Sequence, residues 1–322
     1  MLFGAFKALC KQFLVFICIL IVCSAVVWIA NGRQAVTALL ETGVLQMKAP
    51  WVWTFGYGLA FFVSRWGPQL PAALDGVLMP TEATAAAMRR IEQSTFHRNA
   101  WRYTVPITLI GMFLTTVYGI PNTGVARYLI FVGVCAIYYC GAFLLFHFIE
   151  VISAFHGLFV AMNEMQFRTI YSPIHLENLT TYLALTSSIG LFAIYAGFRG
   201  TLTAGFQFHQ EVWRTFLTTP IILFLPGTLF YNYYPRYVFR KILQHRVFKA
   251  MEKLGQADAT TAPSLILDLK ESALLDSQIL PFLDYKSLPS YLVAIFFVLS
   301  LAYNNDPAIR RFVEYLTHLG AK

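Results

Sequence analysis

The sequence predicts an all-α polytopic membrane protein, and its composition, hydropathy and long apolar runs support this fold class. Of the 322 residues, 57% are hydrophobic and only 12% are charged, and the mean hydropathy is +0.59. A soluble domain normally carries about 25% charged residues, because its surface must stay hydrated. Half of that fraction leaves too few charges for a water-exposed surface, so lipid must surround much of the chain.

Five apolar runs predict transmembrane helices: residues 12–30, 104–120, 128–149, 179–198 and 216–234. Two shorter runs, 50–64 and 289–303, begin beside prolines. At about 1.5 Å per residue, they fall short of a hydrocarbon core that is about 30 Å thick. They are either tilted spans or re-entrant or interfacial segments.

The first run and the basic residues together predict the orientation of the chain. Phe13–Ala30 is 18 residues long, whereas the apolar region of a signal peptide has about 7–15, so we expect a retained helix. Lys and Arg collect in cytoplasmic loops. If 50–64 crosses, a cytoplasmic N-terminus leaves 16 basic residues inside and five outside, with three after residue 303 that depend on the last run. We therefore expect a cytoplasmic N-terminus and leave the side of the C-terminus open.

This plan divides the chain into five segments. Residues 1–64 hold the N-terminal spans, 65–103 a cytoplasmic helical segment, 104–234 the main bundle, 235–285 a cytoplasmic helical hairpin, and 286–322 a short apolar segment with an amphipathic C-terminal helix. In 65–103, Thr81 or Thr84 is the expected helix N-cap. In the hairpin, a basic helix is expected to begin at Pro235 and to end at Gly255, followed by a helix with an acidic face over 264–280.

Hydroxyl-bearing and small residues in 179–198, and a Pro-Gly pair in 216–234, are the candidates for lining a pore. They are Thr180, Thr186, Ser187, Gly190, Pro226 and Gly227. Hydroxyls that face a symmetry axis can line a hydrated pore, and a Pro-Gly pair bends or breaks a helix. Two alternatives stay open, because small residues also allow close helix packing and a proline can produce a simple kink.

The basic face that follows the last of the five spans is the candidate ligand site. It comprises Arg236, Arg240, Lys241, His245, Arg246 and Lys249. Cationic side chains bind phosphates, and neighbouring tyrosines can stack on bases. The tyrosines are Tyr231, Tyr233, Tyr234 and Tyr237. The same pattern also fits an interfacial tyrosine belt above positive-inside charges, so a nucleotide or oligonucleotide ligand is one of two interpretations.

The sequence holds no signature of catalysis or of metal or cofactor binding. It contains no GxSxG, HExxH, Walker A or GxGxxG motif, and its five cysteines form no CxxC pair. We therefore expect no enzyme activity, no cofactor and no metal. His147 and Glu150 lie at the cytoplasmic end of 128–149. Ionisable residues at membrane depth are functional candidates, although a hydrated interfacial pair is the simpler explanation.

The overall plan resembles multi-pass membrane effectors of bacterial anti-phage defence, of the Hailong type. Three features carry the resemblance: the Trp51-Val-Trp53 to Ser64-Arg65-Trp66 segment, the Tyr233-Tyr-Pro-Arg236 exit from the predicted span 216–234, and the charged extension after it. The resemblance implies a homo-oligomeric ion channel of the bacterial inner membrane. It also implies gating by a small nucleic-acid signal, made by a soluble nucleotidyltransferase partner.

These observations predict one function and leave two alternatives. The expected function is an oligomeric ion channel gated from the cytoplasmic side, with the pore shared around a symmetry axis because one chain offers few spans. The first alternative is a secondary transporter whose substrate site lies at the bent helix. The second is a membrane scaffold or receptor subunit that docks a soluble partner through 235–285.

Overall fold

The computed structural model describes residues 2–46, 48–118, 124–164, 173–203 and 210–254, together with isolated residues between 263 and 295. Every regular element in these ranges is a helix and none is a strand, which confirms the all-α class for the described part of the chain. The predicted acidic helix over 264–280, the run 289–303 and the C-terminal amphipathic helix lie outside the described ranges.

Ten helical elements follow one another along the described ranges. They are α1 (Leu2–Ala38), the π-helical η1 (Leu39–Gln46), α2 (Ala49–Trp66), α3 (Gln69–Val77), α4 (Glu82–Ser94), α5 (His97–Tyr118), α6 (Gly124–Val160), the 3₁₀ turn η2 (Met162–Glu164), α7 (Pro173–Thr203) and α8 (Gln210–Leu254). The expected N-cap of α4 is Thr81, whose side chain accepts from the Thr84 N–H at 3.2 Å while Thr84 Oγ1 accepts from the Thr81 N–H at 2.6 Å.

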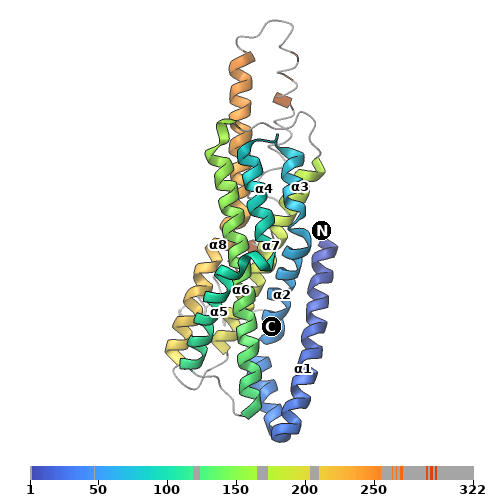
Figure 1. Ribbon diagram of the computed structural model, residues 1–322, viewed down its shortest axis with the longest axis vertical. Helices are drawn as coiled ribbons and strands as arrows, with labels where there is room; N and C mark the ends of the chain where they lie inside the picture. The colour runs from blue at the N-terminus through green and yellow to red at the C-terminus, as the bar shows by residue number, and fades with distance from the viewer. Residues whose placement is uncertain are drawn as a thin grey trace, which may run out of the picture.

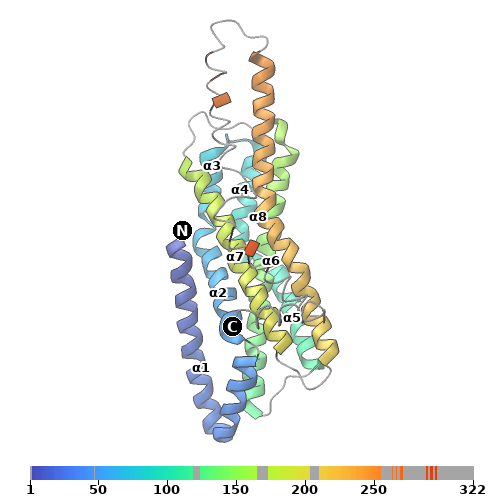
Figure 2. The ribbon, with the colours of Figure 1, turned by 180° about the vertical axis from the view of Figure 1, so that it is seen from behind.

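The helices form an elongated bundle with its short helices at one end (Figures 1 and 2). α1 and α2 run side by side at one edge, α5 lies on α6 at the other, and α7 packs between α2 and α8. α3 and α4 lie beside the outer parts of α6 and α7. This end, which we call the α4 end, also holds the last turns of α8, which project beyond the other helices (Figure 1).

Three of the described helices are long and apolar enough to cross a membrane, over Leu2–Glu41, Gly124–Val160 and His175–Gly197. They coincide with the predicted spans 12–30, 128–149 and 179–198. The predicted count of five is not confirmed: 104–120 falls on α5 and 216–234 on α8, both helical but outside that set. The shorter run 50–64 forms α2, which packs against α1.

Burial rises steadily from the edge of the bundle to its centre. Only 11% of the most apolar stretch of α1 is buried, against 67% for α7. α1 instead exposes large apolar side chains such as Ile21, Trp28 and Ile29. Lipid is the solvent that such a surface requires, so the exposed face of α1 agrees with a membrane protein.

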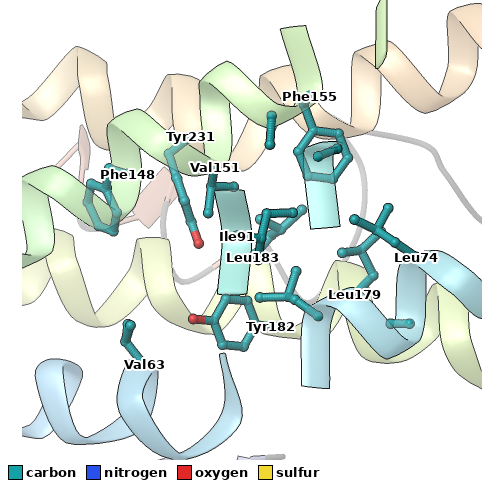
Figure 3. Packing of buried hydrophobic residues seen from close by; sticks show 14 of the residues in the cluster. Val63, Leu74, Ile91, Phe148, Val151, Phe155, Leu179, Tyr182, Leu183 and Tyr231 are labelled. Atoms are coloured by element: carbon teal, nitrogen blue, oxygen red, sulfur yellow. The ribbon is translucent and has the colours of Figure 1, made fainter. Parts of the chain in front are cut away.

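The central core is built from α2, α3, α4, α6, α7 and α8, and Figure 3 shows its packing. Phe155, Ile91, Leu183 and Leu74 fill the space between these helices and are almost inaccessible to solvent. Apolar packing of this kind fixes the helix positions at the α4 end, where polar side chains also enter the core.

α8 is a single helix from Gln210 to Leu254 that continues through Pro220, Pro226 and Pro235. The structure therefore contains neither a break at Pro226-Gly227 nor a new helix that begins at Pro235. Figures 1 and 2 show that α8 is bent along its length, as expected where prolines remove backbone hydrogen bonds. The predicted membrane and extramembrane segments thus belong to one continuous element.

The contact between α5 and α6 provides a test of the packing. Gly111 of α5 is buried, and a Cβ atom added there would lie 2.5 Å from the Tyr138 ring. We expect Gly111→Ala to lower the free energy of unfolding by about 1–3 kcal/mol, the usual effect of overpacking. Thermal unfolding in detergent, followed by tryptophan fluorescence, measures the change.

The matched control is Gly141→Ala on α6, where an added Cβ meets nothing within 4 Å. Because alanine favours a helix over glycine by up to about 1 kcal/mol, this variant should be neutral or slightly more stable. Equal melting temperatures for the two variants would contradict the observed packing of α5 on α6.

Candidate functional site

The outer parts of α6 and α8 together form a surface of aromatic and basic side chains, which we call the α6–α8 surface. It comprises His156 and Phe159 from α6 and Phe230, Tyr233, Tyr234, Tyr237, Arg240 and Lys241 from α8. His156 Nδ1 lies 2.8 Å from the Tyr234 hydroxyl, which joins the two helices. The ring centroids of Phe230 and Tyr234 are 4.7 Å apart, and Lys241 Nζ lies 5.6 Å from the Tyr237 ring centroid.

The α6–α8 surface lies on the parts of α6 and α8 toward the α4 end. His156 is nine residues beyond His147 on α6, which is roughly 13 Å at the helical rise. Tyr234, which contacts His156, is only three residues beyond Tyr231, the α8 residue that contacts His147. His156 and Phe159 also belong to a helix that is apolar enough to cross a membrane. The position therefore fits an interfacial tyrosine belt as well as a ligand surface.

Five of the six predicted ligand residues belong to the outer part of α8. Arg240, Lys241 and His245 are half-buried, Lys249 is exposed, and the side chain of Arg246 lies outside the described set. Lys249 Nζ donates to the Asn163 carbonyl at 3.2 Å and so ties α8 to the turn that follows α6. Cations beside stacked rings are suited to phosphates and aromatic bases.

Arg236 differs from the other predicted ligand residues. Its side chain is only 1% exposed, and its Nη2 donates to the Thr180 carbonyl of α7 at 2.9 Å. The structure therefore places this guanidinium inside the bundle, where it joins α8 to α7. Thr180, a predicted pore-lining residue, supplies its backbone oxygen to this contact.

The other predicted pore-lining residues fall into two groups. Thr186, Ser187 and Gly190 of α7 are buried, and Ser187 Oγ donates to the Thr228 carbonyl of α8 at 3.1 Å. A Cβ on Gly190 would lie 3.4 Å from Thr228 and 3.5 Å from Leu59 and Phe148, so this glycine serves helix packing. Pro226 and Gly227 are exposed on α8. In this conformation α8 covers the hydroxyls of α7, and the pore-lining role stays a prediction.

A second polar group, which we call the His147 junction, lies inside the bundle near the α4 end. It consists of Ser94 (α4), His147 (α6), Tyr182 (α7) and Tyr231 (α8), all of which are nearly inaccessible to solvent. His147 Nδ1 lies 2.9 Å from Ser94 Oγ, and His147 Nε2 lies 3.1 Å from the Tyr182 hydroxyl and 3.2 Å from the Tyr231 hydroxyl. One imidazole therefore joins four helices.

The hydrogen bonds around Ser94 assign the tautomer of His147. The Ser94 hydroxyl has a single proton, and Oγ lies 2.7 Å from the Ile91 carbonyl, which can only accept. Ser94 therefore receives a hydrogen bond from His147 Nδ1–H. In the neutral imidazole, the Nε2 lone pair then accepts from the tyrosine hydroxyls. Figure 3 shows Tyr182 and Tyr231 directing their hydroxyls into the same interior region.

Sequence reasoning named two members of the His147 junction without linking them: His147, and Tyr231 as a tyrosine that could stack on bases, a role that its complete burial rules out in this conformation. His147 was a candidate together with Glu150, but Glu150 is half-buried and has no part in the junction. Ser94, Tyr182 and Tyr231 were missed as a group, because each lies on a different helix. The available signal was the histidine itself, since an imidazole in an apolar span requires partners from neighbouring helices.

The chemistry of both regions is that of binding and helix contact. Among the described residues, no group of three or more His, Cys, Asp and Glu side chains could hold a metal ion. The His147 junction offers hydrogen bonds that can be exchanged, and the α6–α8 surface offers cations and aromatic rings. The fold and these regions define a helical membrane-type protein with a polar centre.

Comparison with known proteins adds no family to this description. The sequence matches no protein-family model, and no curated protein or solved structure matches it at a significant level.

The buried position of Arg236 gives a prediction that separates it from the surface cations. We expect Arg236→Gln to lower the free energy of unfolding by about 1.5–3 kcal/mol, the usual contribution of a hydrogen bond from a charged group. Lys241→Gln removes a cation at the half-buried α6–α8 surface and should change stability by less than about 0.5 kcal/mol. Thermal unfolding of both variants measures the difference, and equal effects would contradict the internal role of Arg236.

Proposed function

We propose that this protein is an oligomeric ion channel of the bacterial inner membrane, gated from the cytoplasmic side by a ligand that binds the α6–α8 surface. The observation that carries the proposal is the length and continuity of α8, which has 45 residues from Gln210 to Leu254. Such a helix is about 67 Å long, roughly twice the thickness of a hydrocarbon core. One element therefore carries both the ligand surface and residues of the membrane bundle.

The orientation in this proposal follows from charge. Lys7 and Lys11 lie near the start of α1, Arg89 and Arg90 on α4, and Lys241 and Lys249 on the outer part of α8. In Figure 1 the N-terminus of α1 is directed toward the α4 end, and α4 and the outer part of α8 lie further along in the same direction. The positive-inside rule assigns that end to the cytoplasm.

The proposed ligand is a nucleotide or a short nucleic acid. Phosphates favour Arg240, Lys241 and Lys249, and bases favour the rings of Tyr234 and Tyr237. The resemblance to Hailong-type defence effectors motivates the same ligand class and a soluble nucleotidyltransferase as its source. Antiviral defence is then the biological setting of the channel.

The described conformation corresponds to the closed channel in this proposal. Ser187 and Thr186 of α7 are covered, and Ser187 is hydrogen-bonded to the backbone of α8. Pro226 and Gly227 are exposed on α8, on the part that would face neighbouring subunits. Movement of α8 away from α7 opens the path past these hydroxyls.

Charge reversal of the ligand surface tests the proposal. In planar bilayers, short DNA or nucleotides should change the conductance of the purified protein. We expect the triple variant Lys241→Glu, Arg246→Glu, Lys249→Glu to raise the half-activating ligand concentration at least about tenfold, because it removes charge-assisted contacts to phosphate. The wild-type response should also weaken as salt rises.

The matched control reverses three exposed arginines at the same end of the molecule, Arg89, Arg90 and Arg98. It changes the net charge equally but leaves the α6–α8 surface intact, so the ligand response should stay within about twofold of wild type. A ligand response unchanged in the first variant, or lost equally in both, would reject this surface as the ligand site.

The covering of Ser187 by α8 gives a second test of the channel. In a variant without native cysteines, Ser187→Cys should react slowly with a water-soluble thiol reagent when no ligand is present. Ligand should raise the reaction rate at least about tenfold, because protection ends when the covering helix moves. Gly227→Cys, at an exposed position of α8, is the control and should change little. Equal rates for Ser187→Cys with and without ligand would contradict a pore along α7.

A docking subunit is the second candidate function, and one observation favours it. Phe248 and Met251 are 68% and 60% exposed on the part of α8 that projects beyond the bundle. Large apolar side chains in water mark contacts with partner proteins. Bilayer recording separates the two functions, since a docking subunit carries no current of its own.

A further inference from the structure

The His147 junction presents two tyrosine hydroxyls to one imidazole nitrogen. After Nδ1–H has bonded to Ser94, the imidazole has one lone pair left, on Nε2. Two phenol hydroxyls face that lone pair, from Tyr182 at 3.1 Å and from Tyr231 at 3.2 Å. A single lone pair forms one strong hydrogen bond, so one tyrosine bonds to Nε2 and the hydroxyl of the other is left to the neighbouring hydroxyls.

The two tyrosines lie on helices with different positions in the bundle, so losing one is not equivalent to losing the other. Tyr182 belongs to α7, which lies in the middle of the bundle between α2 and α8. Tyr231 belongs to α8, which reaches the α6–α8 surface. If α8 withdraws Tyr231, Tyr182 still satisfies Nε2, and no buried acceptor is left without a partner. A lost partner without such a substitute costs the full desolvation of the acceptor.

A third hydroxyl completes the arrangement. The Thr186 hydroxyl is buried and lies close to the Tyr182 and Tyr231 hydroxyls, although it forms no hydrogen bond of good geometry in this conformation. Its oxygen can accept a hydrogen bond from whichever tyrosine does not bond to His147. The junction therefore has a polar partner ready for each of its two arrangements.

The rest of the α7–α8 contact has the same polar character. Arg236 bonds to Thr180 on the outer side of the junction, and Ser187 bonds to the Thr228 carbonyl on the inner side. Hydrogen bonds of this kind have discrete partners, and at His147 Nε2 a second partner is already in place for a shift of α8. Packed interfaces with two discrete arrangements are the elements that switch in proteins.

We propose that the His147 junction is a partner-exchange latch for α8, in which Tyr231 is the partner that leaves and Tyr182 is the partner that takes over. With Tyr231 engaged, α8 lies against α6 and α7. With Tyr231 released, Tyr182 holds Nε2 and α8 moves. The inference rests on the proposed role of α8 as the moving helix, but it concerns the latch and not conduction. Ser94 is the positioning residue that fixes the imidazole in the required tautomer.

The latch predicts opposite effects of two conservative substitutions. Tyr182→Phe removes the substitute partner, so release of Tyr231 would leave Nε2 unsatisfied; α8 should open less. Tyr231→Phe removes the bond that is lost on release, so α8 should open more. The experiment is hydrogen–deuterium exchange of peptides covering 228–243, on the full-length protein in nanodiscs without ligand. We expect exchange to slow about fivefold in the first variant and to accelerate about fivefold in the second.

A matched control and a second measurement protect this test from general effects on stability. Tyr57→Phe deletes the hydroxyl that donates to the Ala136 carbonyl of α6 at 2.7 Å, a contact that does not involve α8. It should leave exchange in 228–243 within twofold. Thermal unfolding shows whether each variant is folded. Exchange that changes in the same direction in both junction variants, or in neither, overturns the latch.

This outcome is separate from that of the proposed function. Exchange is measured without ligand and without current, so opposite effects of the two variants would support the latch even if the protein proved silent in bilayers. Conversely, if the protein conducts but the two variants show the same change in exchange, the proposed channel function stands and the latch is rejected.

Discussion

An imidazole buried among apolar side chains needs hydrogen-bond partners from the protein, because no water reaches it. His147 is fully buried, and it obtains these partners from α4, α7 and α8. Each of those helices must therefore hold its position and rotation relative to α6. The apolar core around the junction supplies most of the attraction, whereas the junction specifies which face of each helix meets the centre. The positions of α4 and α8 are in this sense set by one side chain.

The continuity of α8 extends this constraint beyond the bundle. α8 is one continuous helix, so a contact at the α6–α8 surface acts on the same element that carries Tyr231 and Thr228. His156 and Tyr234 join α6 to α8 at 2.8 Å, and Phe155 packs against Phe239 in the core beside them. A ligand that shifts the outer contacts therefore changes the energy of the inner ones through a continuous physical connection.

Much of the fold could be predicted from the sequence, because apolar run length reports directly on helices in lipid. The spans 12–30, 128–149 and 179–198 and the Thr81 cap follow from local patterns. The continuity of α8 could not, because prolines usually signal an end and only neighbouring helices decide whether one is tolerated. Arg236 was assigned to the surface for a similar reason: its spacing matches that of the exposed cations, and only the packing of α7 against α8 buries it. The His147 junction combines residues from four helices, and no local pattern links them.

The contacts of α8 differ in kind from those of α1, and this difference bears on which helix can move. α1 meets α2 through close packing, with Gly4 against Trp66 and Gly58 against Leu9. Such a contact has one optimum, since any shift opens space or creates overlap. α8 meets α7 through polar contacts at Ser187 and Thr180, and its Tyr231 shares the Nε2 atom of His147 with Tyr182 of α7, which can take over that hydrogen bond. Close packing holds a helix in one place, whereas exchangeable hydrogen bonds permit two, so the polar seam along α7 is the place in this bundle where a rearrangement costs least.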